Sequence, residues 1–237
     1  MQKWLPYCGA APAPAEWLAR WNFDPLLLSV LLFVGLWAGR RTDAATTFWA
    51  GMGVLLLLFV SPLCALSSAL FSVRVAHHVA LTAMAAPLLA SGWRGLPAPD
   101  RPAIWAALHI LLFWFWHAPA PYASALANDG LYWAMQLSLL ASAFLFWSSL
   151  RAATAPMAIG LLLVMMVQMG LLGALITFAS FPLYPPHYVS TQAWGLAPIE
   201  DQQLAGLIMW APAALFYLAA ALWRAWGLLA PATARAR

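Results

Sequence analysis

The longest stretch of this sequence without an acidic or basic residue extends from Ala152 to Ile199, and most of its first half is apolar. A helix over residues 156–179 would rise about 1.5 Å per residue, which is enough to cross a hydrocarbon core of about 30 Å. Lipid offers the backbone no hydrogen-bond partners, so a single apolar segment of this length is stable there only as a helix. This stretch therefore predicts an integral membrane protein.

The rest of the chain repeats this pattern, because it is 65% hydrophobic and only 8% charged. A soluble domain has about one quarter charged residues, so we expect no soluble domain. The apolar segments predict an all-α, polytopic membrane protein with seven transmembrane helices, over residues 25–39, 46–66, 71–92, 103–117, 131–150, 156–179 and 198–223. We therefore divide the chain into a periplasmic, interfacial segment (1–24), the transmembrane domain (25–226) and a cytoplasmic tail (227–237).

Local signals support several of these boundaries. Asp24 followed by Pro25 is a typical helix start, with the carboxylate as N-cap. We expect Pro62 to bend the second helix and Pro87 to kink the third, since proline lacks the N–H that a helix interior needs. Residues 118–130, which include an Asn-Asp-Gly sequence, are predicted as a loop.

The cations are unevenly distributed over the two sides that seven helices create. Eight of the eleven Lys and Arg residues fall on one side, namely Arg40, Arg41, Arg94, Arg101, Arg151, Arg224, Arg235 and Arg237. The other side holds Lys3, Arg20 and Arg74. Cytoplasmic loops are enriched in Lys and Arg, so we expect the N-terminus outside and the C-terminus in the cytoplasm of a multi-pass inner (plasma) membrane protein. The position of the cations in the predicted topology thus explains the net charge of +4. We therefore predict that the protein contacts the lipid bilayer and does not bind nucleic acid.

The helix predicted over residues 71–92 carries Arg74, His77 and His78 in its first two turns. Ionisable groups inside a membrane helix are energetically unfavourable, so they usually face the interior of the bundle or a polar cavity. Neighbouring residues diverge by about 100° around a helix, so at most one of His77 and His78 points at a given centre. We expect a functional site around the outer half of this helix.

Other polar side chains lie near the outer face or deeper along other helices. Imidazole and thioether groups are copper ligands, and Met favours Cu(I). The candidate copper ligands are His78, His117, Met169, His77 and His109. The candidates for attracting the cation or contacting a partner at the outer mouth are Glu200, Asp201, His187 and Tyr184.

Several of these residues also have a purely structural interpretation. Met side chains commonly fill gaps between helices. His109 is equally explained as a core histidine bonded to a neighbouring helix. Arg74 can extend towards the outer headgroups. Glu200 and Asp201 suit the positive end of a helix dipole without any further role.

The two cysteines, Cys8 and Cys64, are too few for a disulfide framework and do not form a C-x-x-C motif. Cys64 is most simply a small buried apolar residue. The sequence contains no H-E-x-x-H, nucleophile-elbow, Gly-rich phosphate-loop or Walker motif, and we expect no enzymatic activity.

Several short motifs occur in an order and spacing typical of one family. They are Ser61-Pro62-Leu63, His78 with Ala86-Pro87-Leu88-Leu89 and Gly92, His117-Ala118-Pro119 with Tyr122, Gln168-Met169-Gly170, Thr177-Phe178-Ala179, Pro182-Leu183-Tyr184-Pro185, Pro198-Ile199-Glu200-Asp201-Gln202-Gln203, Gly206 and Met209-Trp210. The resemblance covers residues 21–223, and the Asp-Gln-Gln to Met-Trp segment is its most specific part. In these motifs the sequence resembles the CtaG-type cytochrome c oxidase assembly factor family of the inner membrane.

This resemblance implies a protein needed to mature a haem-copper cytochrome c oxidase, at the stage of copper delivery or insertion. Oxidase subunits and periplasmic copper chaperones would be its partners. We expect His78 and His117 to bind copper, with Met169 as a soft third ligand. Arg74 and Gln136 depart from the family pattern, because many members have His at these positions. A copper importer and a haem-binding membrane redox protein remain alternatives.

Overall fold

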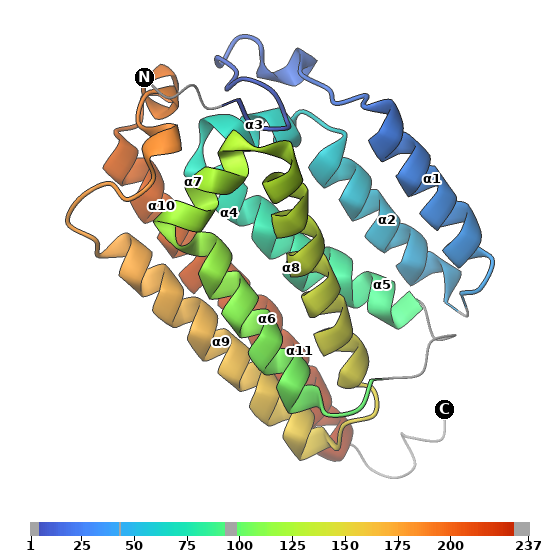
Figure 1. The fold of residues 1–237 in the computed structure, drawn as a ribbon. Coiled ribbons are helices and arrows are strands. Elements are labelled where there is room, and N and C mark those ends of the chain that lie inside the picture. Colours follow the sequence, from blue (N-terminus) through green and yellow to red (C-terminus); the bar gives the residue numbers. More distant parts are fainter. Residues whose placement is uncertain (1–4, 43, 93–98, 230–237) are drawn as a thin grey trace.

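The computed structural model describes residues 5–42, 44–92 and 99–229, and every regular element in these ranges is helical (Figure 1). The all-α prediction is therefore confirmed. The α-helices are α1 (Pro25–Gly39), α2 (Ala45–Phe59), α3 (Leu63–Ala69), α4 (Phe71–Ala80), α5 (Ala86–Gly92), α6 (Pro102–His117), α7 (Pro119–Ala127), α8 (Asp129–Ser149), α9 (Ala155–Thr177), α10 (Pro198–Trp210) and α11 (Pro212–Leu229). The shorter elements are η1 (Trp17–Ala19), the π-helical η2 (Leu81–Ala85), η3 (Pro185–His187) and η4 (Ser190–Trp194).

Four helical segments within the described residues are long and apolar enough to cross a membrane. They are Phe71–Gly92, Asp129–Ser149, Ala155–Thr177 and Pro198–Leu229. Two bent pairs, α2 with α3 and α6 with α7, raise the number to six if each pair is one span. The predicted first span, α1, is a shorter apolar helix of 15 residues. The structure thus gives four to six candidate spans, and seven remains a prediction.

The loop predicted over residues 118–130 is wrong, because most of it forms α7. Ala118 adopts an extended conformation and Pro119 then occupies the first position of a new helix, which its fixed φ favours. Helices α6 and α7 meet at a bend of 73°. The Asn128 side chain accepts a hydrogen bond from the Leu131 backbone N–H at 3.0 Å, so the Asn-Asp-Gly sequence starts α8 instead of forming a turn.

The predicted second and third helices each deviate from straight geometry near their prolines. Helix α2 ends at Phe59, and α3 continues at an angle of 47°, with Pro62 between them. The segment Phe71–Gly92 stays one span, but the turn before Pro87 is the π-helical η2. A π-turn accommodates the missing N–H and the ring of a proline within a helix.

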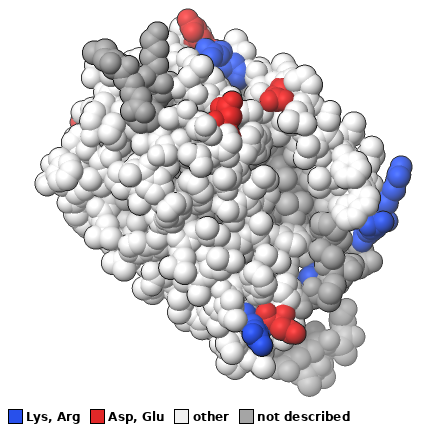
Figure 2. Space-filling view, viewed as in Figure 1, with Lys and Arg blue, Asp and Glu red and all other residues white. Residues whose placement is uncertain are grey.

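The surface has the distribution expected of a membrane protein. On the face shown in Figure 2, the charged side chains gather towards the two ends, and a broad uncharged band lies between them. On α9, Val167 and Leu171 are 56% and 48% exposed, whereas Met165 and Met169 are buried. Such a large exposed apolar surface would aggregate in water and is stable against lipid.

Residues 5–24 cover the end of the bundle at which α4 and α8 begin (Figure 1). Asp24 caps α1 as predicted, accepting hydrogen bonds from the Leu26 and Leu27 backbone N–H groups at 2.8 and 3.2 Å. The Tyr7 hydroxyl donates to the same carboxylate at 2.6 Å, and this bond lowers the pKa of Asp24. The segment is also joined covalently to the bundle by a disulfide between Cys8 and Cys64.

Candidate functional site

Helix α4 carries its three ionisable side chains into the interior of the bundle. Arg74, His77 and His78 are all at most 2% exposed. The two histidines have different partners, as neighbouring positions on a helix require. His77 Nε2 donates to the Leu58 carbonyl at 3.2 Å, and its ring lies edge-on to Phe59. His78 instead faces α6 and α8, so His78 is the residue of this pair at the centre.

A chain of hydrogen bonds joins His78 to His117 and Gln136. His78 Nδ1 lies 3.4 Å from His117 Nε2, and Gln136 Nε2 lies 3.4 Å from His78 Nε2. His117 Nδ1 lies 2.8 Å from the Phe113 carbonyl, which can only accept. In the neutral state His117 is therefore protonated at Nδ1, so its Nε2 accepts from His78 Nδ1–H, and His78 Nε2 accepts from the Gln136 amide.

Gln136 has one unused polar atom in this arrangement. Its Oε1 is buried and has no hydrogen-bond partner among the described residues. Rotating the amide by 180° would present Oε1 to His78 Nε2 instead of the NH₂ group. Gln136 can thus stabilise either tautomer of His78, and the second tautomer leaves Nδ1 of His78 free to bind a metal.

Arg74 lies one helical turn from His78, towards the start of α4, and is completely buried. Its Nη1 donates to the Tyr132 hydroxyl at 3.3 Å, and its guanidinium carbon lies 5.2 Å from the centre of the Tyr132 ring. Nε and Nη2 have no hydrogen-bond partner in the part of the chain that the structure describes. The alternative that Arg74 extends to the outer headgroups is therefore wrong, because the side chain stays inside the bundle.

A layer of Tyr and His side chains lies beside the histidine pair, towards the end of the bundle at which α4 begins. The Tyr184 hydroxyl donates to the His117 carbonyl at 2.7 Å. His187 Nδ1 lies 3.3 Å from the Ala69 carbonyl and therefore carries the proton, so its Nε2 accepts from the Tyr122 hydroxyl at 2.7 Å. Burial lowers the pKa of His187 to about 3 and raises the pKa of Tyr184. Both groups are therefore neutral near pH 7.

Asp201 and Glu200 differ in what they contact. The Asp201 carboxylate is fully buried and accepts hydrogen bonds from the Phe71 N–H at 2.6 Å, the Ser72 N–H at 3.2 Å and the Ser72 hydroxyl. It thus caps α4 from the neighbouring helix α10. The exposed Glu200 accepts from the Ala197 N–H at 2.7 Å, at the start of its own helix. The role predicted for this pair in attracting a cation stays a prediction.

Met169 lies with His109 around a separate small cavity. The cavity has a volume of about 10 Å³ and is lined by His109, Ile110, Phe113, Trp114, Met165, Gln168 and Met169. His109 Nδ1 donates to the Ser142 hydroxyl at 2.9 Å, because that hydroxyl itself donates to the Leu139 carbonyl. His109 Nε2 has no partner among the described residues. Met169 thus lines a pocket with His109, and its role as a third ligand stays a prediction.

The described residues contain no group of three or more His, Cys, Asp or Glu side chains placed to hold a metal ion. His78 and His117 form a pair, which is an incomplete set for a permanently bound ion. Imidazole nitrogens bind ions such as zinc at about 2.0 Å, so an ion between nitrogens 3.4 Å apart fits with a bent arrangement.

The disulfide between Cys8 and Cys64 is the feature that sequence analysis missed. The half-cystines have Cα atoms 5.3 Å apart and are separated by 56 residues. A signal was present in the predicted topology, which puts both residues near the outer side of the membrane. Disulfides persist in oxidising compartments such as the periplasm.

Comparison with known proteins supports the family resemblance. The family model described as cytochrome c oxidase caa3 assembly factor matches residues 30–230, which include all the helices from α2 to α11. No curated protein and no solved structure matches this chain. Because the matched region covers most of the sequence, the chain belongs to the cytochrome c oxidase caa3 assembly factor family.

Proposed function

We propose that this assembly factor binds copper in transit at His78 and His117 and passes it to the oxidase during maturation. The observation that carries the proposal is the approach of His78 Nδ1 to His117 Nε2, at 3.4 Å and inside the bundle. Each nitrogen has a lone pair in one accessible tautomer. Imidazole is a good ligand for copper.

Gln136 supports the change of tautomer that copper binding needs. In the metal-free state His78 carries its proton at Nδ1, where the ion would bind. If the proton moved to Nε2, Nε2–H would donate to Oε1 of the rotated Gln136 amide. In the present rotamer Oε1 has no partner among the described residues. His117 is already prepared, since its Nδ1 donates to Phe113 and its Nε2 has the lone pair. Bonds of this kind orient metal-binding histidines in many proteins.

The charge of Arg74 favours transient binding of copper over its storage. Positions four residues apart lie on the same face of a helix, so the guanidinium charge of Arg74 and a cation at His78 would repel each other. This repulsion would weaken the binding of a cation at His78, and it would weaken the binding of a divalent ion more. The arrangement therefore favours Cu(I) and a short residence time.

Copper exchange requires movement of the outer layer. His78 and His117 are at most 1% exposed, and Tyr184 and His187 lie between them and the outer end. We propose that docking of an oxidase subunit or a copper chaperone displaces the loop that carries Tyr184 and His187. In this proposal the closed loop slows the entry of metal ions while no partner is bound, without preventing binding at equilibrium.

We also propose seven spans with the N-terminus outside. The two bent helix pairs, the four long segments and α1 would provide the seven. The excess of Arg at one side supports a cytoplasmic C-terminus. The disulfide near the opposite end supports a periplasmic position for that end.

The test replaces His78 by Gln in cells grown under copper limitation. Gln keeps much of the volume and some hydrogen bonding, so a structural histidine predicts normal oxidase activity. A copper ligand predicts loss of oxidase maturation with normal abundance of the assembly factor in the membrane. His77→Gln is the matched control, because His77 is buried on the same helix and faces Leu58.

Two further outcomes separate the alternatives. Full oxidase activity in the His78→Gln cells would contradict the proposal. If only His109→Gln abolishes maturation, the copper site is the cavity beside Met169 instead. A haem absorption spectrum of the purified protein would identify the redox alternative, and normal oxidase maturation with reduced copper uptake would identify the importer.

A further inference from the structure

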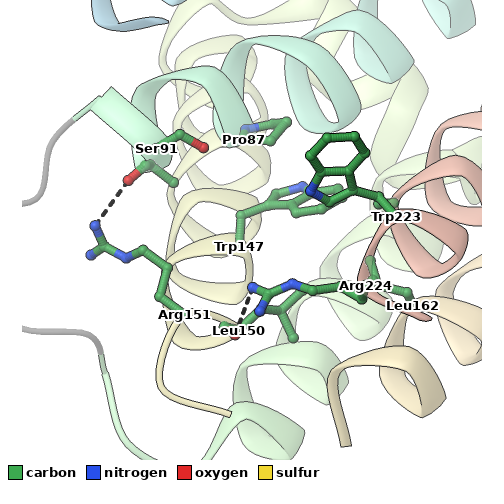
Figure 3. Close-up of a pocket in the computed structure, with 10 residues that line it drawn as sticks. Pro87, Ser91, Trp147, Leu150, Arg151, Leu162, Trp223 and Arg224 are labelled. Carbon is green, nitrogen blue, oxygen red and sulfur yellow. Dashed lines mark hydrogen bonds between the residues drawn. The ribbon is translucent and has the colours of Figure 1, made fainter. Parts of the chain in front are cut away.

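A second polar site lies at the opposite end of the bundle, where α8 ends and α9 begins. A pocket of about 430 Å³ opens between α5, α8, α9 and α11 (Figure 3). Its described lining residues are Pro87, Ala90, Ser91, Trp147, Leu150, Arg151, Leu162, Ala220, Trp223 and Arg224. None of these residues is acidic, and two are arginines, so the pocket is positively charged.

The two arginines are held in place by backbone carbonyls. Arg224 Nη2 donates to the Leu150 carbonyl at 2.9 Å. Arg151 Nη1 donates to the Ala90 carbonyl at 3.1 Å, and its Nε lies 3.3 Å from the Ser148 carbonyl. Both side chains are half-buried, and Figure 3 shows them on the side of the pocket opposite Pro87. Guanidinium groups ordered in this way are prepared to bind an anion, because little side-chain entropy is lost on binding.

The remaining walls suit a molecule that is polar at one end and apolar elsewhere. Trp147 and Trp223 lie between the arginines and Pro87 in Figure 3, and Trp223 is 78% exposed. Tryptophan is enriched at the level of the lipid headgroups. Leu222 and Trp226, on either side of Trp223 and Arg224 on α11, are 60% and 71% exposed, so an apolar surface continues from the pocket.

We propose that this pocket binds the phosphate group of an anionic glycerophospholipid. Arg151 and Arg224 would donate to the phosphate oxygens, in the planar geometry that arginine offers to phosphate. The acyl chains would lie along the exposed apolar side chains of α11. By the distribution of cations this end faces the cytoplasm, where anionic lipids attract basic groups. The proposal uses no residue of the histidine cluster.

The experiment measures lipids that stay bound to the purified full-length protein, by native mass spectrometry with phosphatidylglycerol or phosphatidylcholine added. We expect phosphatidylglycerol to be retained in preference to phosphatidylcholine. Arg224→Gln and Arg151→Gln should each weaken its binding about tenfold, which corresponds to about 1.4 kcal/mol. Arg40→Gln is the matched control, because Arg40 is exposed on the predicted same side and does not line the pocket.

Three results would overturn the proposal. One is equal retention of the two lipids by the unmodified protein. Another is equal retention of phosphatidylglycerol by the Arg40→Gln and Arg224→Gln proteins. A third is release of the bound lipid by excess inorganic phosphate, which would identify a free-anion site. Arg224→Lys keeps the charge, so it should keep the preference for phosphatidylglycerol and shows that loss in Arg224→Gln does not come from misfolding.

Discussion

The cap that Asp201 provides to α4 gives the most quantitative prediction. α4 carries Arg74, His77 and His78, and its first two backbone N–H groups both donate to the Asp201 carboxylate. In Asp201→Asn, one carboxylate oxygen becomes an NH₂ group, which cannot accept. The Phe71 N–H or the Ser72 N–H then loses its acceptor inside the bundle.

The magnitude follows from the bonds that are lost. A buried N–H without a partner costs about 1–3 kcal/mol. Asn keeps one accepting oxygen, so only one acceptor is lost. We therefore expect Asp201→Asn to lower the free energy of unfolding by about 1–3 kcal/mol. The matched control is Glu200→Gln, since Gln at this exposed position still accepts from Ala197 and should cost less than about 0.5 kcal/mol.

The assay is denaturant unfolding of the purified proteins in micelles, followed by the fluorescence of the 15 Trp residues. A change below about 0.5 kcal/mol in Asp201→Asn would refute the assignment of Asp201 as the cap of α4. An equal loss in Glu200→Gln would also refute it, because the effect would then come from the charge near α10. If Asp201 acts on a partner or cation instead, oxidase activity should fall while the unfolding free energy stays normal.

Three further predictions concern the disulfide, the membrane topology and His187. Reduction of the disulfide, or Cys8→Ser, should lower stability by about 4 kcal/mol in the loop-entropy description for a separation of 56 residues, and thiol alkylation should detect neither cysteine before reduction. A cysteine introduced at Ser190 should react with an impermeant thiol reagent in intact spheroplasts, whereas one at Thr154 should not; the reverse result would invert the topology. The pKa of His187 is about 3 in the folded state and about 6.5 when unfolded, so the unfolded state binds more protons between these values and stability falls as the pH is lowered from 6.5 towards 3. His187→Gln should make unfolding less dependent on pH in this window, and an unchanged dependence would contradict its burial as a neutral group.

Hydrophobic segments predicted the helices well because length and apolarity alone decide whether a segment is stable in lipid. The start of α1 at Asp24 and Pro25 was predictable for a local reason, since a cap depends on adjacent residues. Helix α7 was missed because its Pro and Asn residues are equally typical of turns. Contacts with neighbouring helices decide whether such residues form a helix or a turn. The local sequence around residue 119 does not show these contacts.

The site was predicted only in part, because its contacts join distant segments. His78 and His117 were both predicted to lie in the same half of the membrane, and in the structure a hydrogen bond joins them directly. The rotation of α9 about its axis could not be deduced, and it puts Met169 beside the His109 cavity. The partners of Asp201 are about 130 residues away in sequence, so no local pattern could indicate them.

The most direct test of copper transit is a titration of the purified, metal-free protein with Cu(I) in competition with a chromophoric chelator. We predict that the unmodified protein binds one Cu(I) per chain and that His78→Gln and His117→Gln each abolish this binding. His77→Gln should bind as the unmodified protein does, since His77 faces Leu58. Unchanged Cu(I) binding by both His78→Gln and His117→Gln, with all four proteins folded, would contradict the account.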